Sequence, residues 1–299
     1  MSELLYGCIE AGGTKFIAGI VAAPSDIRET TRIATTNPED TIGAAEAWLH
    51  AAIGRHGGIC ALGIASFGPI ETDTTKPNWG YITRTTKAGW SGTDFAARLR
   101  RIFGVPVGFD TDVNGAALSE ARWGAAQSQS VSVYVTVGTG IGGGTIVNNM
   151  PLRGLSHSEM GHLYPRRHAD DLTFAGICPF HGDCLEGLAS GPAIKARWGM
   201  SVSELPVDHF GHDVIAFYLG QLVSTLQSIM EPGRIIFGGG VMNTPGLLAK
   251  VGEAADRLGA GYFRGQPSKI IVSPGLGEQT GLLGALALAQ KALAQQDLI

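Results

Sequence analysis

The sequence has few charges, few cysteines and no long apolar run, and each absence excludes a class of protein. Only 16% of the 299 residues are charged, the net charge is −4, and no Lys/Arg-rich run occurs. A surface that neutralises many nucleic-acid phosphates is therefore not expected. No segment has about 20 consecutive apolar residues, which argues against a membrane span. The N-terminus lacks the basic start and apolar stretch of a signal peptide, so we expect a cytoplasmic protein.

The four cysteines are too few for a disulfide framework, but two of them lie beside histidines. Cys178, His181 and Cys184 form a Cys-x-x-His-x-x-Cys run, and His162 precedes it. Two thiolates and two imidazoles supply the four tetrahedral ligands that structural zinc prefers. We therefore predict a structural Zn²⁺ site made of these four residues, with the nearby His157 and His168 as competing ligands.

Two carboxylates flank the predicted zinc loop. Glu159 precedes His162, and Glu186 follows Cys184. A loop anchored by a metal holds such side chains in a fixed geometry, which suits the binding of sugar hydroxyls. The alternative is that both are solvated surface acids.

Glycine is abundant, at 44 residues, and three glycine-rich turns each follow an apolar segment. Glycine lets backbone N–H groups approach an anion closely, so these turns are candidates for phosphate binding. None of them matches the Walker or the Rossmann pattern. The turns are Gly12-Gly13-Thr14-Lys15, Gly138-Thr139-Gly140 and Gly238-Gly239-Gly240.

The order of the predicted elements indicates an α/β fold. Residues 4–22 and 131–147 share one plan of strand, glycine turn and strand, which suggests two similarly built lobes or, alternatively, two unrelated hairpins. Further strands are expected at 59–66, 105–109, 234–237 and 269–272, and helices at 41–54, 92–103, 113–123, 211–230 and 279–295. Asp112 stands where a helix begins, so its structural interpretation is a simple N-cap.

Taken together, the motifs resemble those of the ROK family of sugar kinases and repressors, and in particular its bacterial fructokinase branch. They occur in the family's order and span most of the chain. The residues that carry the resemblance are Glu10–Phe16, Asp110–Leu118, Thr136–Gly144, His157–His162, Cys178–Glu186 and Ile236–Val241.

The resemblance implies an actin-like ATPase (ribonuclease H-like) fold with two lobes, a central cleft and a zinc-stabilised loop. The N-terminal lobe would comprise residues 1–114, with a C-terminal helix at about 280–299 packing back on it. The C-terminal lobe would comprise 115–279 and carry the zinc loop. ATP, Mg²⁺ and structural Zn²⁺ are the implied cofactors, a small sugar is the implied substrate, and a homodimer is the implied assembly.

The resemblance also assigns roles to residues of this chain. Asp112 matches the catalytic base, and Glu10 is expected to help hold Mg²⁺. ATP would be bound by Gly12, Gly13, Thr14, Lys15, Gly138, Thr139, Gly140, Gly239 and Gly240. The sugar would be bound by Gly68, Thr111, Asp112, Glu159, His162 and Glu186.

Two departures from the pattern of glucose-preferring members point to the substrate. Thr111 stands where many of those members have Asn, and His181 stands where a third zinc cysteine is usual; both features resemble fructokinases. We therefore expect phosphorylation of D-fructose to fructose 6-phosphate, with a glucokinase, a mannokinase or an amino-sugar kinase as alternatives. A sugar-responsive repressor is not expected, because the first phosphate motif begins near residue 10 and no helix-turn-helix module precedes it.

Overall fold

The computed structural model describes residues 4–296, which form two compact units. Unit 1 contains the described chain up to Trp123, the short segment Arg153–His157 and the described chain from Leu276. Unit 2 contains Gly124–Leu152 and Ser158–Gly275. Strands and helices alternate in both units, which confirms the α/β class. Residues 115–123, assigned from the sequence to the second lobe, continue a helix of unit 1.

Unit 1 is built on a five-stranded sheet with the order β3-β2-β1-β4-β7. β1, β4 and β7 run parallel to one another, while β2 and β3 continue from β1 as an antiparallel meander. The strands are β1 (Tyr6–Ala11), β2 (Lys15–Ala23), β3 (Asp26–Ala34), β4 (Ala61–Ser66) and β7 (Val107–Thr111), and a small separate ribbon pairs β5 (Tyr81–Ile82) with β6 (Thr93–Asp94).

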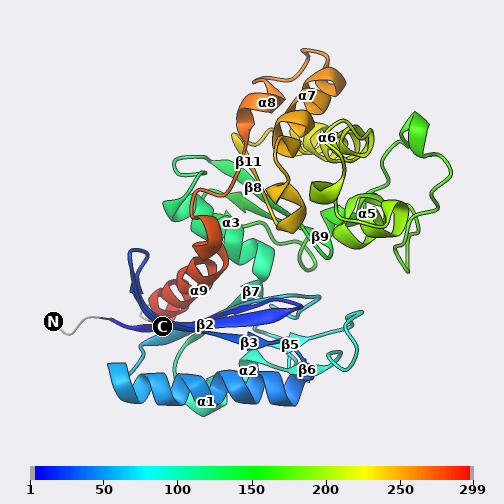
Figure 1. Ribbon diagram of the computed structural model, residues 1–299. Helices are drawn as coiled ribbons and strands as arrows, with labels where there is room; N and C mark the ends of the chain where they lie inside the picture. Colours follow the sequence, from blue (N-terminus) through cyan, green and yellow to red (C-terminus); the bar gives the residue numbers. More distant parts are fainter. Residues whose placement is uncertain (1–3, 297–299) are drawn as a thin grey trace. The chain divides into compact units, whose positions relative to one another are not determined.

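Helices cover both faces of this sheet (Figure 1). α1 (Pro38–His56) and α2 (Ala96–Phe103) lie on one face, and α3 (Asp112–Trp123) and α9 (Thr280–Gln296) lie on the other. All six residues of the interior strand β4 are consequently buried, as expected for a strand with both faces covered. The single turn η5 (Gly277–Gln279) leads into α9.

α9 rests directly on the backbone of β4 and β7. A Cβ atom built on Gly63 of β4 would overlap the carbonyl oxygen of Ala285, and one built on Gly108 of β7 would overlap that of Leu288. Glycine at both positions therefore lets the helix and the sheet approach more closely than side chains would allow.

Unit 2 repeats the sheet of unit 1. Its strand order is β10-β9-β8-β11-β12, and β8, β11 and β12 are parallel while β9 and β10 form the antiparallel meander. The two lobes suggested by the paired hairpins are thus confirmed as one topology used twice. The strands are β8 (Val131–Val137), β9 (Ile141–Val147), β10 (Met150–Pro151), β11 (Arg234–Gly238) and β12 (Ile271–Val272).

The core of unit 2 lies between its sheet and the helices α6 and α7 (Figure 1). α6 is apolar on most of its circumference, and twelve of its twenty residues are buried. The helices are α4 (Leu185–Ala189), α5 (Gly191–Trp198), α6 (Gly211–Met230), α7 (Leu247–Gly259) and α8 (Pro267–Ile270), with single turns η1 (Met160–His162), η2 (Ala169–Asp171), η3 (Val202–Glu204) and η4 (Gly240–Asn243).

Two element boundaries differ from the sequence-based expectation because of a neighbouring structural feature. The strand expected at 269–272 is wrong in its first half, because Pro267 starts the short helix α8 and only Ile271–Val272 pair as a strand. The helix expected from residue 92 begins at Ala96, because Thr93–Asp94 pair with β5. The helix expected at about 280–299 is present up to Gln296, and residues 297–299 lie outside the described chain. Within residues 4–296, no helix has the length and apolar character needed to cross a bilayer.

The contact between α9 and β4 predicts the effect of one substitution. Gly63→Ala should destabilise unit 1 by about 2 kcal/mol or more, because the added methyl group meets rigid backbone rather than a movable side chain. Thermal denaturation should show a melting temperature lower by about 4–8 °C. Gly43→Ala, in the middle of α1 with no atom within 4 Å of the added methyl group, is the matched control and should be neutral or stabilising. Equal melting temperatures for the two variants would contradict the role of Gly63.

Candidate active site and metal centre

The parallel strands of unit 1 bring several predicted site residues to one edge of the sheet. β1 ends at the Gly12-Gly13-Thr14 turn, β4 ends two residues before Gly68, and β7 ends at Thr111. The carboxyl ends of neighbouring parallel strands lie at the same edge, which is where α/β proteins bind ligands. Unit 1 thus collects the first glycine turn, Gly68, Thr111 and Asp112 at one edge.

Two carboxylates lie at this edge, Glu10 and Asp112, and the charge of Asp112 acts on Glu10. Burial and the charge of Asp112 raise the pKa of Glu10 to about 7, against the lowering effect of Lys15 and Arg32. Glu10 Oε2 is buried and has no hydrogen-bond partner among the described residues. An unpartnered buried carboxylate beside a second one is an arrangement that a divalent cation would stabilise.

Burial also raises the pKa of the Asp112 carboxyl group, to about 6, although Asp112 Oδ1 accepts a hydrogen bond from the Val113 N–H at 2.9 Å. A carboxylate with a pKa near neutrality, held at the start of α3, has the properties of a general base.

The interpretation of Asp112 as the N-cap of α3 is wrong, because Thr111 fills that position. The Asn114 N–H donates to Thr111 Oγ1 at 3.1 Å, as a capping hydroxyl accepts from the third residue of a helix. Asp112 is consequently the first helical residue, where the helix dipole favours a negative charge. Because Thr111 caps the helix, the Asp112 carboxylate uses only Oδ1 for the hydrogen bond from Val113, and its other oxygen can accept a proton from a substrate. The Thr111 hydroxyl accepts from Asn114, so its hydrogen can still be donated.

Sequence analysis assigned no role to Asp110, the buried residue that holds the start of α3 in place. Asp110 is 1% exposed, and its Oδ1 accepts hydrogen bonds from the Thr111 N–H and from Asn114 Nδ2, each at 2.8 Å. Its Oδ2 forms an ion pair with Arg153 Nη2 at 2.7 Å. An Asp two residues before the base and an Asn two residues after it were visible in the sequence, but the pairing with Arg153 depends on the tertiary fold.

In unit 2, two of the predicted phosphate turns are neighbours. The Gly138-Thr139-Gly140 turn follows β8, Gly239 and Gly240 follow β11, and these strands pair in parallel. A Cβ atom built on Gly138 would lie 4.0 Å from the Gly240 nitrogen. Gly239 has φ +91, a conformation that favours glycine. The two turns lie at the same edge of the sheet, and turns of this kind can bind phosphate through their backbone N–H groups.

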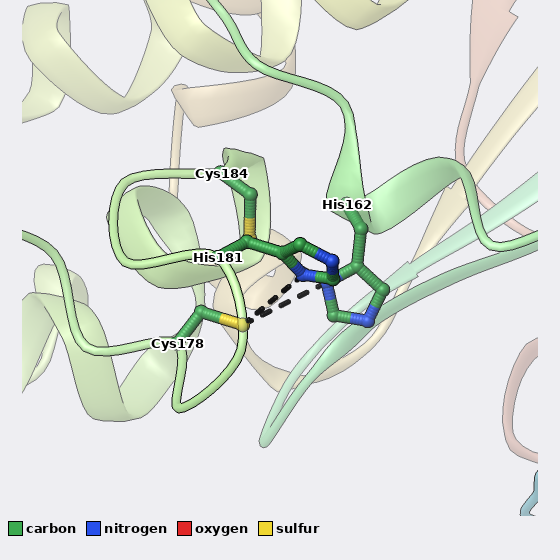
Figure 2. Close-up of side chains that lie close together, drawn as sticks. All are labelled: His162, Cys178, His181 and Cys184. Carbon is green, nitrogen blue, oxygen red and sulfur yellow. Dashed lines mark hydrogen bonds between the residues drawn. The ribbon is translucent and has the colours of Figure 1, made fainter.

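The four predicted zinc ligands come together in unit 2 (Figure 2). Their ligand atoms all lie within 4.8 Å of one another. His162 Nδ1 lies 3.5 Å from Cys184 Sγ and 3.9 Å from Cys178 Sγ, and Cys178 Sγ lies 3.6 Å from His181 Nδ1. Tetrahedral zinc with ordinary Zn–S and Zn–N bonds separates such atoms by roughly 3.6 Å. The donor set therefore fits a zinc ion in both chemistry and spacing.

The Cys184 thiol is in an environment that disfavours its ionisation without a cation. Burial, together with the neighbouring Cys178, raises the pKa of Cys184 to about 11. Metal binding requires thiolates, so a bound dication would supply the compensating charge. The loop is closed by two backbone hydrogen bonds between Cys178 and Gly182, at 3.1 and 2.9 Å, and Gly182 has φ +61.

The two competing ligands considered from the sequence are excluded by the geometry. His168 Nδ1 accepts a hydrogen bond from the Asp170 N–H at 3.2 Å and is not a member of the cluster. His157 belongs to unit 1, where its Nε2 would lie 3.1 Å from a Cβ atom built on Gly68. The ambiguity in the ligand set is thereby resolved in favour of His162 and His181.

The two predicted sugar-binding acids lie next to members of the cluster in the sequence. Glu186 follows Cys184 in α4, and its Oε2 accepts a hydrogen bond from the Ile141 N–H at 2.9 Å, next to the Gly138–Gly140 turn. Glu159 precedes η1, and its backbone carbonyl accepts from the His162 N–H at 3.0 Å while its side chain is exposed. Both acids are thus attached to short helical turns that carry a member of the cluster or follow one directly.

Comparison with known proteins relates this geometry to a family. The ROK family model matches residues 6–292. The chain is 48% identical over 289 residues to a fructokinase of Zymomonas mobilis, covering 95% of this chain and 96% of that protein. It is 39% identical over 291 residues to a fructokinase of Pediococcus pentosaceus, covering 97% and 99%.

A solved structure agrees with the fold. The ROK hexokinase of Thermus thermophilus superimposes with a TM-score of 0.79 at 28% identity, covering 98% of this chain and 100% of that one. The mixed α/β architecture with two sheets is thus the actin-like ATPase fold of the ROK sugar kinases. Because the family model matches nearly the whole chain, the chain belongs to the ROK family.

Proposed function

We propose that the protein is an ATP-dependent fructokinase that transfers the γ-phosphoryl group of ATP to a hydroxyl of D-fructose, giving fructose 6-phosphate and ADP. The observation that carries this proposal is the Asp112 carboxylate. It stands at the start of α3, has a pKa near 6, and lies at the same sheet edge as the first glycine turn. The fructokinase relatives at 48% and 39% identity support the choice of sugar.

In the proposed reaction, Asp112 accepts the proton of the attacking sugar hydroxyl. The hydroxyl oxygen forms a bond to the γ-phosphorus as the bond to the bridging oxygen of ADP breaks. Such transfer depends mainly on positioning and on charge stabilisation, so backbone N–H groups of the glycine turns and the Lys15 ammonium would hold the phosphates. Mg²⁺ supplies charge neutralisation when it is bound, and Glu10 would hold it, directly or through water.

The sugar would be held by residues of the zinc loop together with those near the base. Gly68 and Thr111 are the proposed contacts beside Asp112, and Glu159, His162 and Glu186 are the proposed contacts of the zinc loop. Zinc would act structurally, because four protein ligands fill its tetrahedral shell and leave no open position for a substrate. A homodimer in the cytoplasm is the assembly and location that the family resemblance suggests.

The substrate proposal predicts the outcome of a sugar panel. Measured by coupled ADP release, kcat/KM should be highest for fructose, because Thr111 lacks the amide that an Asn would offer to a pyranose hydroxyl. A higher specificity constant for glucose, mannose or N-acetylmannosamine would reject the fructose assignment while leaving the kinase assignment in place. Absence of ADP release with every sugar would reject both.

The base proposal predicts that Asp112→Asn lowers kcat by about 10² or more, because the variant cannot accept a proton. ATP affinity should stay nearly unchanged. Asp208→Asn, at an exposed position of unit 2, is the control and should keep full activity.

The wild-type pH profile gives an independent check. Only the ionised carboxylate can act, so kcat/KM should be constant above the pKa and fall about tenfold per pH unit below pH 6. Near-normal turnover of Asp112→Asn, or a profile without an acid limb near pH 6, would remove Asp112 from this role.

The metal proposal predicts one zinc per chain in elemental analysis of the purified protein. Cys178→Ser should release it, lower the melting temperature by several degrees and weaken sugar binding, because Glu159 and Glu186 lose their anchored loop. Cys60→Ser is the matched control: this half-buried thiol of unit 1 donates to the Leu5 carbonyl at 3.1 Å and is not a member of the cluster. Native protein without zinc, or unchanged zinc in Cys178→Ser, would end the assignment.

A further inference from the structure

Unit 1 contains a cavity of about 400 Å³ that none of the proposed catalytic residues lines. It lies beside the edge strand β7, where Val107, Gly108 and Phe109 form one wall and residues of α9 form another. The segment that begins at Arg153 and the loop that contains Glu71 complete the lining. A volume of this size falls in the range of cavities that bind small molecules.

Two cations face this cavity. Arg153 is anchored by the ion pair of its Nη2 with the buried Asp110, and its side chain remains 42% exposed. Lys291, on α9, makes no hydrogen bond or ion pair with any residue between 4 and 296. Burial and the charge of Arg153 both lower the pKa of Lys291, so the ammonium lies in the field of a second cation. The Asp110 carboxylate acts in the opposite direction on this pKa but is ion-paired with Arg153, so the Lys291 ammonium, which has no ion-pair partner within residues 4–296, is available to an anion.

The remaining lining residues differ in chemistry from these cations. Trp79 and Phe109 provide aromatic surface, and their rings meet edge to face at 6.4 Å. Glu71 and Asp73 provide carboxylates that local partners hold in place: Glu71 Oε2 pairs with Lys76 at 2.9 Å, and Asp73 accepts from the Thr75 N–H and hydroxyl. Carboxylate oxygens retain further lone pairs after such contacts, so they can accept hydrogen bonds from hydroxyl groups.

We propose that this cavity is a second binding site, for a phosphorylated sugar or polyol. Arg153 and Lys291 bind the phosphate, since a guanidinium fork matches phosphate geometry and an ammonium adds a point charge. Glu71 and Asp73 accept hydrogen bonds from the hydroxyls, and Trp79 packs against the carbon skeleton. The site does not depend on the proposed kinase function, because it shares no residue with the proposed machinery.

Calorimetric titration with sorbitol 6-phosphate at constant ionic strength tests this site. The wild-type protein should bind sorbitol 6-phosphate more tightly than sorbitol, which lacks the phosphate group. It should also bind it more tightly than inorganic phosphate, which lacks the polyol chain. Lys291→Gln should weaken binding by about tenfold or more, the loss expected for one charge-assisted contact. Lys291→Arg should restore most of the affinity, and Lys195→Gln, at an exposed position of unit 2, should leave it unchanged.

A crystal soaked with the same compound provides the direct check. Its phosphate should lie within hydrogen-bond distance of both Arg153 and Lys291. The proposal is overturned if no binding is measured, if Lys291→Gln binds as tightly as wild type, or if the phosphate is found only in the glycine turns. Loss of kinase activity is not a readout here, so failure of this proposal and failure of the fructokinase proposal are distinguishable.

Discussion

The geometry of both units depends on one constraint, namely that three parallel strands in each sheet end at the same edge. In unit 1 this places the Gly12–Lys15 turn and Asp112 together, and in unit 2 it places the Gly138–Gly140 turn beside Gly239–Gly240. Tight turns and helix starts follow these strand ends, so backbone N–H groups and a carboxylate meet there without long loops. The same strand order used twice explains why glycine turns of the kind proposed to bind phosphate occur in two distant parts of the sequence.

Buried charge determines how the site residues are held. Asp110 uses both oxygens to fix the backbone at Thr111, the side chain of Asn114 and the Arg153 guanidinium. A buried carboxylate is tolerated only when its hydrogen bonds and its charge are satisfied, so this network specifies one conformation at the end of β7. In unit 2 the buried thiols of Cys178 and Cys184 correspond to the Asp110 carboxylate, and a metal ion would balance their charge.

Much of the fold was predictable from the sequence, because periodicity and glycine turns are local signals. The hairpins at 4–22 and 131–147 and the helix at 211–230 match the structure closely. β3 was missed, since Asp26–Ala34 is an edge strand with many polar residues and no apolar run. The short strand β12 was predicted too long, because a helix-starting proline outweighed the apolar character of the residues that follow it.

The site was predictable where a motif is contiguous and unpredictable where the tertiary fold makes it. The Cys178–Cys184 spacing predicted three members of the cluster directly, whereas the choice of His162 over His157 as the fourth required the structure. The capping role of Thr111 was hidden, because Asp112 is an equally good capping residue by type and only the hydrogen bond from Asn114 distinguishes them. The ion pair of Asp110 with Arg153 had no local signal at all.

The division of the chain between the units has a consequence for its synthesis. Unit 1 takes Arg153–His157 from the middle of the chain and α9 from its end, so neither unit is one continuous stretch. α9 supplies the helical cover of β4 and β7, and it follows all of unit 2 in the sequence. The part of the N-terminal sheet that α9 covers therefore stays exposed while unit 2 is being translated, and exposed apolar surface of this kind is what chaperones bind.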